Sequence, residues 1–193
     1  MRQLIFCALL FMVNSAFAQK GEDSINVVLI DAVFDSTASA NRYVHSSGFS
    51  VRYPYGWNRA FGQDDRLKLV LRETNPDYPA NFKETVELTS SRITDSTSNV
   101  ESFLAEASMQ LKQTWEAYQL TTEVIDSGFV NINDRECGYL YAKISRLSQE
   151  KLIIVIPGPS RVYTIEYTAT NNTFTMFLED YWRMINSYTF IER

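Results

Sequence analysis

Apolar and polar residues alternate along much of the chain from residue 49 onward, a period of two that is typical of half-buried β-strands. In the first half, the pattern predicts strands at Phe49–Tyr53 and Leu67–Leu71, and a third strand that includes Phe82, Val86 and Leu88. In the second half, it predicts strands over residues 121–125, 129–132, 137–144, 152–156 and 163–170. The run 152–156 is wholly apolar, which predicts a strand in the middle of a sheet.

Turn-forming residues separate these strands. The segment Pro54–Trp57 begins with a residue that ends a ladder, and we expect Gly56 to adopt a positive φ and Trp57 to pack against the core. The pair Asn133–Asp134 predicts a hairpin turn. Pro157–Ser160 predicts another turn.

Two segments instead place apolar residues at helical spacing. The first stripe consists of Val100, Phe103, Leu104, Ala107, Leu111 and Trp115. Ser98 and Glu101, at the start of this stripe, have the three-residue spacing of a capping box. The second stripe consists of Phe174, Phe177, Leu178, Tyr181, Met184 and Ile185. Residues 171–173 are expected to cap it, and residues 186–190 end it and can add a short strand.

Most strands follow one another through short turns, so the sheet should be largely antiparallel. The two amphipathic helices are then available to cover its faces. The pattern therefore predicts the α+β class: a largely antiparallel sheet flanked by amphipathic helices.

The amino end has the three parts of a secretory signal peptide. A basic start at Arg2 precedes the apolar run Leu4–Phe17, and Ala16-Phe17-Ala18 provides small residues at the cleavage site. We expect a signal peptide over residues 1–18, an N-terminal strand (residues 25–30) and loop (residues 35–47) within residues 19–47, and the main domain over residues 48–193. The mature protein should be periplasmic or secreted.

The charge balance narrows the class of partner. The chain has 18 basic and 23 acidic residues, and cleavage after Ala18 removes only Arg2, so the mature net charge is 17 − 23 = −6. Nucleic-acid binding needs clustered Lys and Arg, so we expect no nucleic-acid partner. No second apolar segment of the sequence is long enough to cross a membrane.

Few residues of the mature chain offer catalytic chemistry. His45, the single histidine, lies in a Ser- and Asn-rich stretch and is expected to be a solvated loop residue. Cys137 is the one cysteine left after cleavage and should act as a small buried hydrophobe. Asp64 and Asp65, with Asp77 in the next loop, could serve as acid and base or bind calcium, but a solvated turn is the simpler interpretation. We therefore predict no catalytic, cofactor-binding or metal-binding residues, no cofactor and no enzymatic activity.

Two ends of the domain resemble one family. The run Phe49–Trp57 is similar to the opening strand and turn of proteins with the PsbP-like (Mog1/PsbP) fold. The strand Tyr163–Thr170, the helix that follows and the closing run Ile185–Phe190 are similar to the end of that fold. The resemblance covers roughly residues 49–190 and implies an α/β/α sandwich. It also implies an exported, non-enzymatic accessory or binding protein of a larger assembly. It gives no residue-level site, and it does not imply a photosystem function.

Three functions stay open at this point. The first is an accessory protein that contacts a protein partner of the cell envelope. The second is a small-molecule carrier, in which the core built from 12 Phe, 11 Tyr and 3 Trp opens into a pocket. The third is a hydrolase that uses paired carboxylates.

Overall fold

The computed structural model of the chain describes residues 40–60, 67–71, 84–95 and 97–190. The expected signal peptide, the expected strand at residues 25–30, and Phe82 lie outside the described residues, and those expectations stay predictions. In the described part of the chain, no helix is long and apolar enough to cross a membrane.

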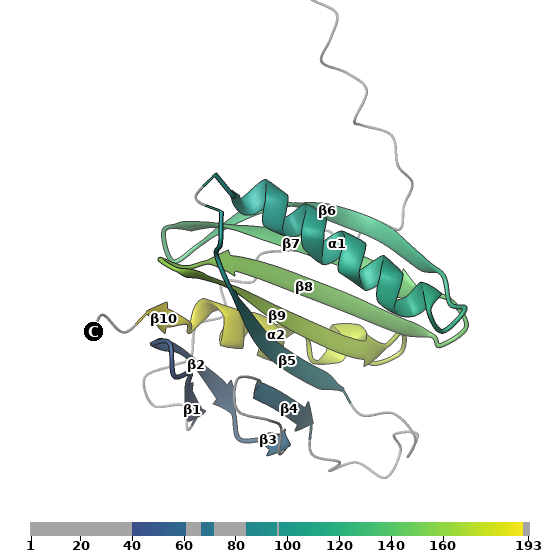
Figure 1. The fold of residues 1–193 in the computed structure, drawn as a ribbon. Coiled ribbons are helices and arrows are strands. Elements are labelled where there is room, and N and C mark those ends of the chain that lie inside the picture. Colours follow the sequence, from purple (N-terminus) through teal and green to yellow (C-terminus); the bar gives the residue numbers. More distant parts are fainter. Residues whose placement is uncertain (1–39, 61–66, 72–83, 96, 191–193) are drawn as a thin grey trace, which may run out of the picture.

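A seven-stranded sheet forms the centre of the molecule (Figure 1). Its strands are β3 (Trp57–Ala60), β4 (Leu67–Leu71), β5 (Thr85–Arg92), β6 (Thr122–Ile132), β7 (Arg135–Ile144), β8 (Gln149–Pro157) and β9 (Arg161–Thr170). Their order across the sheet is β3-β4-β5-β9-β8-β7-β6, and every neighbouring pair is antiparallel. The apolar run 152–156 lies in β8, inside the sheet, as predicted.

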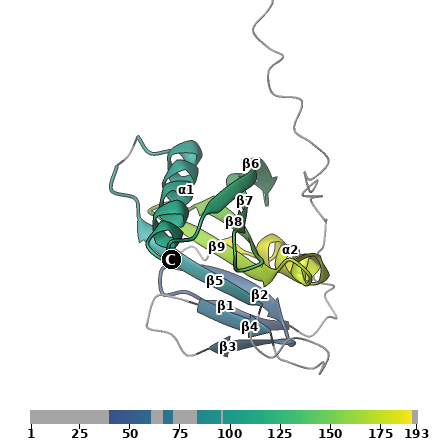
Figure 2. The ribbon, with the colours of Figure 1, turned by 90° about the vertical axis from the view of Figure 1, so that its right-hand side faces the viewer.

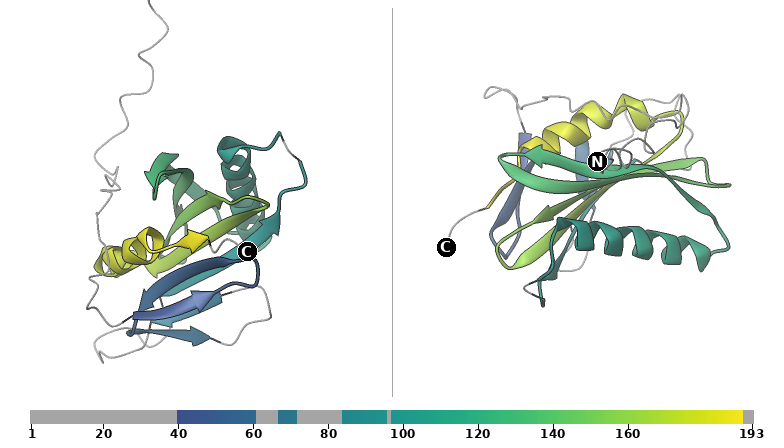
Figure 3. Two further views of the ribbon diagram at one scale, coloured as in Figure 1. Left: turned by 90° about the vertical axis from the view of Figure 1, so that its left-hand side faces the viewer. Right: turned by 90° about the horizontal axis from the view of Figure 1, so that it is seen from above.

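Two helices cover opposite faces of this sheet, α1 (Val100–Glu116) and α2 (Leu178–Asn186). Figure 2 and Figure 3 show them on either side of the strands. The predicted apolar stripe of α1 packs on side chains of β7 and β8 such as Leu140 and Ile153. The α+β class is therefore confirmed, with a largely antiparallel sheet between helices.

A second, three-stranded sheet has the order β1-β2-β10, from β1 (Ala40–Val44), β2 (Phe49–Pro54) and β10 (Thr189–Phe190). The loop expected over residues 35–47 is wrong for residues 40–44, because each of these five residues pairs with one of residues 50–54 of β2. The pairing buries Tyr43, which lies opposite Val51. The strand at residues 40–44 thus belongs with the main domain, although its Ser- and Asn-rich surroundings are typical of a loop.

The main core lies between the seven-stranded sheet, the small sheet and α2. Its largest side chains are aromatic, and Tyr167 and Tyr181 stack with ring centroids 5.3 Å apart. Phe49 stacks on Tyr163 in the same way at 4.4 Å. These contacts account for much of the aromatic content, because the rings pack against one another. Trp57 is almost fully buried, as predicted.

Both helices begin differently from the prediction. The N-cap of α1 is Asn99, whose side chain accepts from the Ser102 N–H at 2.9 Å, while the Ser102 hydroxyl accepts from the Asn99 N–H at 3.0 Å. The Ser98–Glu101 box is therefore wrong by one residue, because Asn99 and Ser102 form the reciprocal pair of hydrogen bonds one position later.

Residues 171–173 do not cap the second helix. A short 3₁₀ turn, η1 (Phe174–Met176), comes first, and α2 begins at Leu178 without a side-chain cap. The Thr173 hydroxyl instead lies 2.7 Å from that of Thr170 at the end of β9. The Thr173 side chain thus connects the segment after β9 to the last residue of that strand.

The turns follow the predictions in part. Asn133 and Asp134 have φ values of 51° and 59°, the left-handed pair that a two-residue hairpin needs, so this turn is confirmed. The expected positive φ at Gly56 is wrong: among the described glycines, Gly48 in the β1–β2 turn has it, at 90°. Residues 121–125 and 129–132 are not two strands, because β6 runs continuously past a bulge between Val124 and Asp126.

Candidate functional site

The single histidine is buried and belongs to a tight turn. His45 is 1% exposed, so the solvated loop residue expected from the sequence is wrong. Its Nδ1 accepts from the Ser47 N–H at 3.1 Å and lies 2.6 Å from the Ser47 hydroxyl, which in turn lies 2.5 Å from the Tyr163 hydroxyl. The ring also meets Tyr163 edge-on, at 6.1 Å between centroids. The contacts to Tyr163 of β9 hold the β1–β2 turn against the main sheet.

A serine hydroxyl beside an imidazole is the arrangement that activates a nucleophile. In this turn, however, the backbone N–H and the hydroxyl of Ser47 both reach the same nitrogen of a residue two positions earlier. That is the geometry of a side chain that closes a turn. Ser47 is exposed, so a Ser47→Ala variant can test whether this serine and His45 have hydrolase activity.

Cys137 behaves as predicted, as a small buried hydrophobe. It is fully buried in β7, and its thiol donates to the Arg135 carbonyl at 3.5 Å. Burial raises the pKa of Cys137 to about 11, because the interior disfavours the thiolate. The thiol is therefore neutral and inaccessible at physiological pH.

The acidic pair singled out from the sequence, Asp64 and Asp65, lies outside the described residues, as does Asp77. In the described part, no group of three or more His, Cys, Asp or Glu side chains is placed to hold a metal ion. The buried carboxylate of Glu150 accepts from the Tyr141 hydroxyl at 2.5 Å. This acid is thus bound to the aromatic core.

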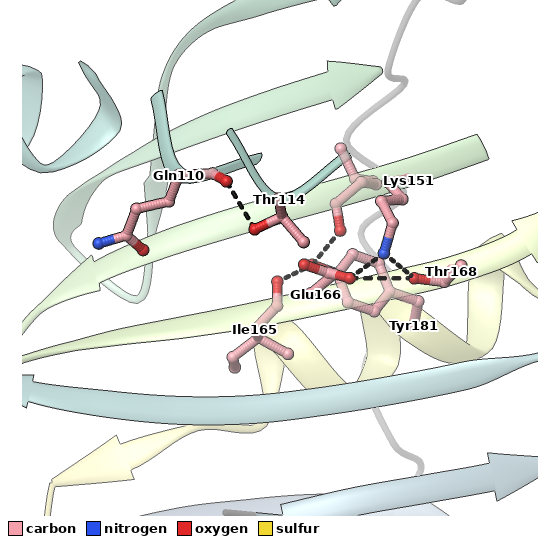
Figure 4. Close-up of polar contacts among 8 residues, drawn as sticks. Gln110, Thr114, Lys151, Ile165, Glu166, Thr168 and Tyr181 are labelled. Atoms are coloured by element: carbon pink, nitrogen blue, oxygen red, sulfur yellow. Dashed lines mark hydrogen bonds and ion pairs between the residues drawn. The ribbon is translucent and has the colours of Figure 1, made fainter. Parts of the chain in front are cut away.

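A polar cluster that the sequence did not reveal lies under the last turn of α1. Figure 4 shows the Lys151 ammonium of β8 donating to the Glu166 carboxylate and, at 2.8 Å, to the Thr168 hydroxyl, both on β9. The ammonium also faces the ring of Trp115 on α1, at 5.4 Å from its centroid. Because a lysine ammonium has three N–H donors, two of them bind these acceptors and the cation faces an aromatic ring.

These contacts make the Lys151 cluster a structural joint between α1, β8 and β9. The register explains its geometry, since Lys151 lies directly opposite Thr168, and Glu166 lies two residues away on the same face. A lysine at the border of an apolar run is usually solvated, so the sequence alone gives little sign of this role. The signal that was available is the alternation of β9, which places the polar side chains of Glu166 and Thr168 on one face.

One segment of the chain is rich in acidic residues and poor in basic ones. The segment 95–136, which contains α1, β6 and the start of β7, has two basic and eight acidic residues, so its net charge is 2 − 8 = −6. The whole chain has a net charge of −5, so all other residues together sum to +1. Seven of the eight acids are exposed, and Asp126 is half-buried. We call the surface of α1 and β6 the acidic side.

The acidic side also exposes large apolar side chains. Met109 on α1 is 51% exposed, Phe129 on β6 is 52% exposed, and Tyr118 just after α1 is 70% exposed. The helix lies over β6, β7 and β8, so its outer surface and β6 form one edge of the fold (Figure 1). Aromatic and Met side chains are enriched in surfaces that bind proteins. The acidic side is therefore the candidate functional site.

Comparisons with known proteins bear on the fold. The sequence matches no protein-family model and no curated protein. Among solved structures, the cyanobacterial PsbP protein CyanoP from Synechocystis sp. PCC 6803 matches with a TM-score of 0.59 at 15% identity, over 79% of this chain and 93% of CyanoP.

A second solved structure is LpqN, described as involved in cell envelope biogenesis of Mycobacterium tuberculosis. It matches with a TM-score of 0.52 at 14% identity, over 80% of this chain and 91% of LpqN. At such identities the likeness concerns the fold. The chain thus has the PsbP-like fold, as the motifs at residues 49–57 and 163–190 predicted.

Proposed function

We propose that this chain is an exported, non-enzymatic accessory protein that binds a protein partner of the cell envelope through its acidic side. The observation that carries the proposal is the separation of charge: the segment 95–136 has a net charge of −6, and once Arg2 is removed with the signal peptide the rest of the mature chain sums to zero. A field of one sign over one face steers a partner of the opposite sign and sets its orientation. The exposed Met109, Tyr118 and Phe129 add apolar contact area on the same side.

The reactive side chains of the described region have structural roles that support a non-enzymatic function. His45 closes a turn, Cys137 is buried as a neutral thiol, and Lys151 joins α1 to the sheet. Catalysis would need such groups to face a substrate. Each instead contacts the protein itself.

The envelope location is supported from two directions. The sequence of residues 1–18 predicts export. The fold is shared with LpqN, which is described as involved in cell envelope biogenesis. We therefore propose that this chain and its partner lie outside the cytoplasm.

The two alternatives make different demands on the molecule. A carrier would need the aromatic core to open, yet the ring of Tyr167 contacts those of Phe174 and Tyr181 at 5.1 and 5.3 Å between centroids. A carboxylate hydrolase would need Asp64 and Asp65 to face each other across a substrate. The acidic side favours a protein partner over either.

Affinity capture from the native envelope tests the proposal. The mature chain serves as bait beside two variants. One neutralises two exposed acids of the acidic side, Glu116→Gln with Glu123→Gln. The matched control neutralises two exposed bases elsewhere, Arg92→Gln with Arg146→Gln. We expect the acid-neutralised bait to recover clearly less of the partner that the mature chain recovers, and the control to recover it unchanged.

Equal recovery by all three baits would contradict a role for the acidic side. An assay for hydrolysis of ester and glycoside substrates completes the test. Turnover that is lost in Asp64→Asn, Asp65→Asn or Ser47→Ala would replace the binding proposal with an enzymatic one.

A further inference from the structure

We infer that the outer edge of β6 accepts an extended, basic segment of the partner protein as an eighth strand of the main sheet. This inference rests on the proposed function, because it names the mode of binding and the chemistry of the partner at the acidic side.

The strand β6 pairs on one side only. Its partner β7 lies along it from the pair Thr122–Ile144 to the pair Ile132–Arg135, and among the described residues no strand pairs with its outer side. An edge strand presents a row of backbone N–H and C=O groups that an incoming strand can bind. Addition of a strand to such an edge is a common way for proteins to bind extended segments.

The two edges of the same sheet differ in their protection. The strand β3 at the opposite edge has four residues, of which Arg59 is one. The strand β6 has eleven residues and no Pro, and its two charged residues, Glu123 and Asp126, lie in its first half. Proteins usually protect edges with short strands, charged side chains, Pro or bulges. A bulge between Val124 and Asp126 interrupts the first half of β6. The second half, Ser127–Ile132, is uncharged and continues regularly to the hairpin.

An exposed aromatic side chain lies in this uncharged half. Phe129 is 52% exposed and lies directly opposite Gly138, the position on β7 where the Leu104 side chain of α1 approaches closely. Phe129 is therefore on the face of the sheet that α1 covers. The flanking residues Val130 and Ile132 are part of the main core. An added strand would cover the Phe129 ring with one of its own side chains.

The charges around this edge define the partner. Glu123 on β6 and Glu136 on β7 are exposed, and Asp126 accepts a hydrogen bond from the Tyr139 hydroxyl at 3.1 Å. On β7, Lys143 lies opposite Glu123, and Arg135 lies opposite Ile132. The hairpin of residues 122–144 has four acidic and two basic residues, a net charge of 2 − 4 = −2, and α1 adds 1 − 3 = −2. The surroundings of the edge are therefore net negative. Alternating Lys or Arg on the incoming strand would face these carboxylates, while the intervening apolar residues would cover Phe129.

The probe for this inference is a fluorescein-labelled peptide of alternating valine and lysine, about ten residues long to match a strand. Its binding to the mature chain is followed by fluorescence anisotropy. Two further peptides serve as references: one replaces each lysine by glutamate, and the other carries backbone N-methyl groups at alternate residues, which remove the ladder donors and keep the charge. The protein variant is Phe129→Lys. Its matched control is Tyr55→Lys, at an aromatic residue that is 60% exposed in the turn between β2 and β3.

We expect the lysine peptide to bind at least about tenfold more tightly than the glutamate and N-methylated peptides, because it alone supplies both charge and ladder. Phe129→Lys should weaken its binding about tenfold or more, and Tyr55→Lys should not. Equal binding of the N-methylated peptide would overturn strand addition, since charge alone would suffice. Unchanged binding by Phe129→Lys would overturn the site.

Two other occupants of the edge give distinct results. If a second copy pairs there, light scattering will show a dimer that Phe129→Lys dissociates. If residues 25–30 of the same chain pair there, their deletion will strengthen peptide binding markedly. Either result would overturn the inference. A native partner whose capture is lost in Glu116→Gln with Glu123→Gln but kept in Phe129→Lys would leave the proposed function standing and defeat only the strand-addition mode.

Discussion

The indole N–H of Trp57 donates to the carboxylate of Asp180 at 3.1 Å. Trp57 is the first residue of the edge strand β3, and Asp180 lies in the first turn of α2. The ring also meets Phe177 edge-on, at 6.5 Å between centroids, and Asp180 in turn binds Arg183 at 3.5 Å. The Trp57 side chain thus connects β3, at the edge of the main sheet opposite β6, to α2.

Removal of this side chain should strongly destabilise the fold. We expect Trp57→Ala to lower the free energy of unfolding by about 3–5 kcal/mol, through lost burial and the cavity left behind. Trp57→Phe should cost less, because it keeps most of the ring contacts and loses the N–H donor to Asp180. Urea unfolding of both variants measures the difference. Wild-type stability in Trp57→Ala would show that the ring does not support the core.

Removal of Lys151 should lower the stability of the protein, because its partner Glu166 is then left without an ion pair. Replacing Lys151 by Met leaves the half-buried Glu166 carboxylate without its ammonium, which should cost about 1–3 kcal/mol. The double variant Lys151→Met with Glu166→Gln should recover most of that loss, because neither partner is then charged. A double-mutant cycle by chemical unfolding gives the coupling. Additive effects of the two changes would contradict a joint role.

Cys137 predicts a pH dependence of stability in alkaline solution. Its pKa is about 11 in the folded protein, raised by burial from an ordinary value of 9.0. The unfolded thiol therefore ionises first, so the stabilisation by the neutral thiol is complete below pH 9 and is lost as the pH rises toward 11. Relative to Cys137→Ala, the wild type should lose about 1 kcal/mol of stability per pH unit in this window. Parallel pH profiles of the two proteins, measured by urea unfolding, would contradict the buried thiol.

The amino terminus of the native protein tests the predicted export. Basic, apolar and small residues follow one another over residues 1–18, so the mature chain should begin near Gln19. Mass spectrometry of protein isolated from the envelope or medium reads this end directly. Intact Met1 in exported material would be incompatible with a cleaved signal.

The sequence predicted the layers of this fold because its strong signals are local. The alternation at Tyr163–Thr170 and the stripe from Val100 to Trp115 each indicate one face that packs on the core. The apolar residues of the strand are buried, and the helical stripe packs on the sheet with Leu111 buried and the others half-buried. The cap of α1 differed by one residue, because Asn99 and Ser102 offer the same pair of hydrogen bonds as Ser98 and Glu101.

The features missed from the sequence depend on contacts between distant residues. His45 is buried because Ser47 binds Tyr163, 116 positions away. Residues 40–44 form a strand because β2 supplies its partner groups. The acidic side was not predicted, since the net charge of the whole chain conceals that of the segment 95–136, whose acids the fold places on α1, β6, the start of β7 and the turns beside them.

Backbone amide hydrogen exchange of the mature chain with and without its captured partner tests the central claim most directly. If the acidic side is the binding surface, amides of α1 and β6 will gain protection when the partner is added, and those of β1, β2 and β3 will not. Protection confined to β1, β2 and β3, with α1 and β6 unchanged, would contradict the account.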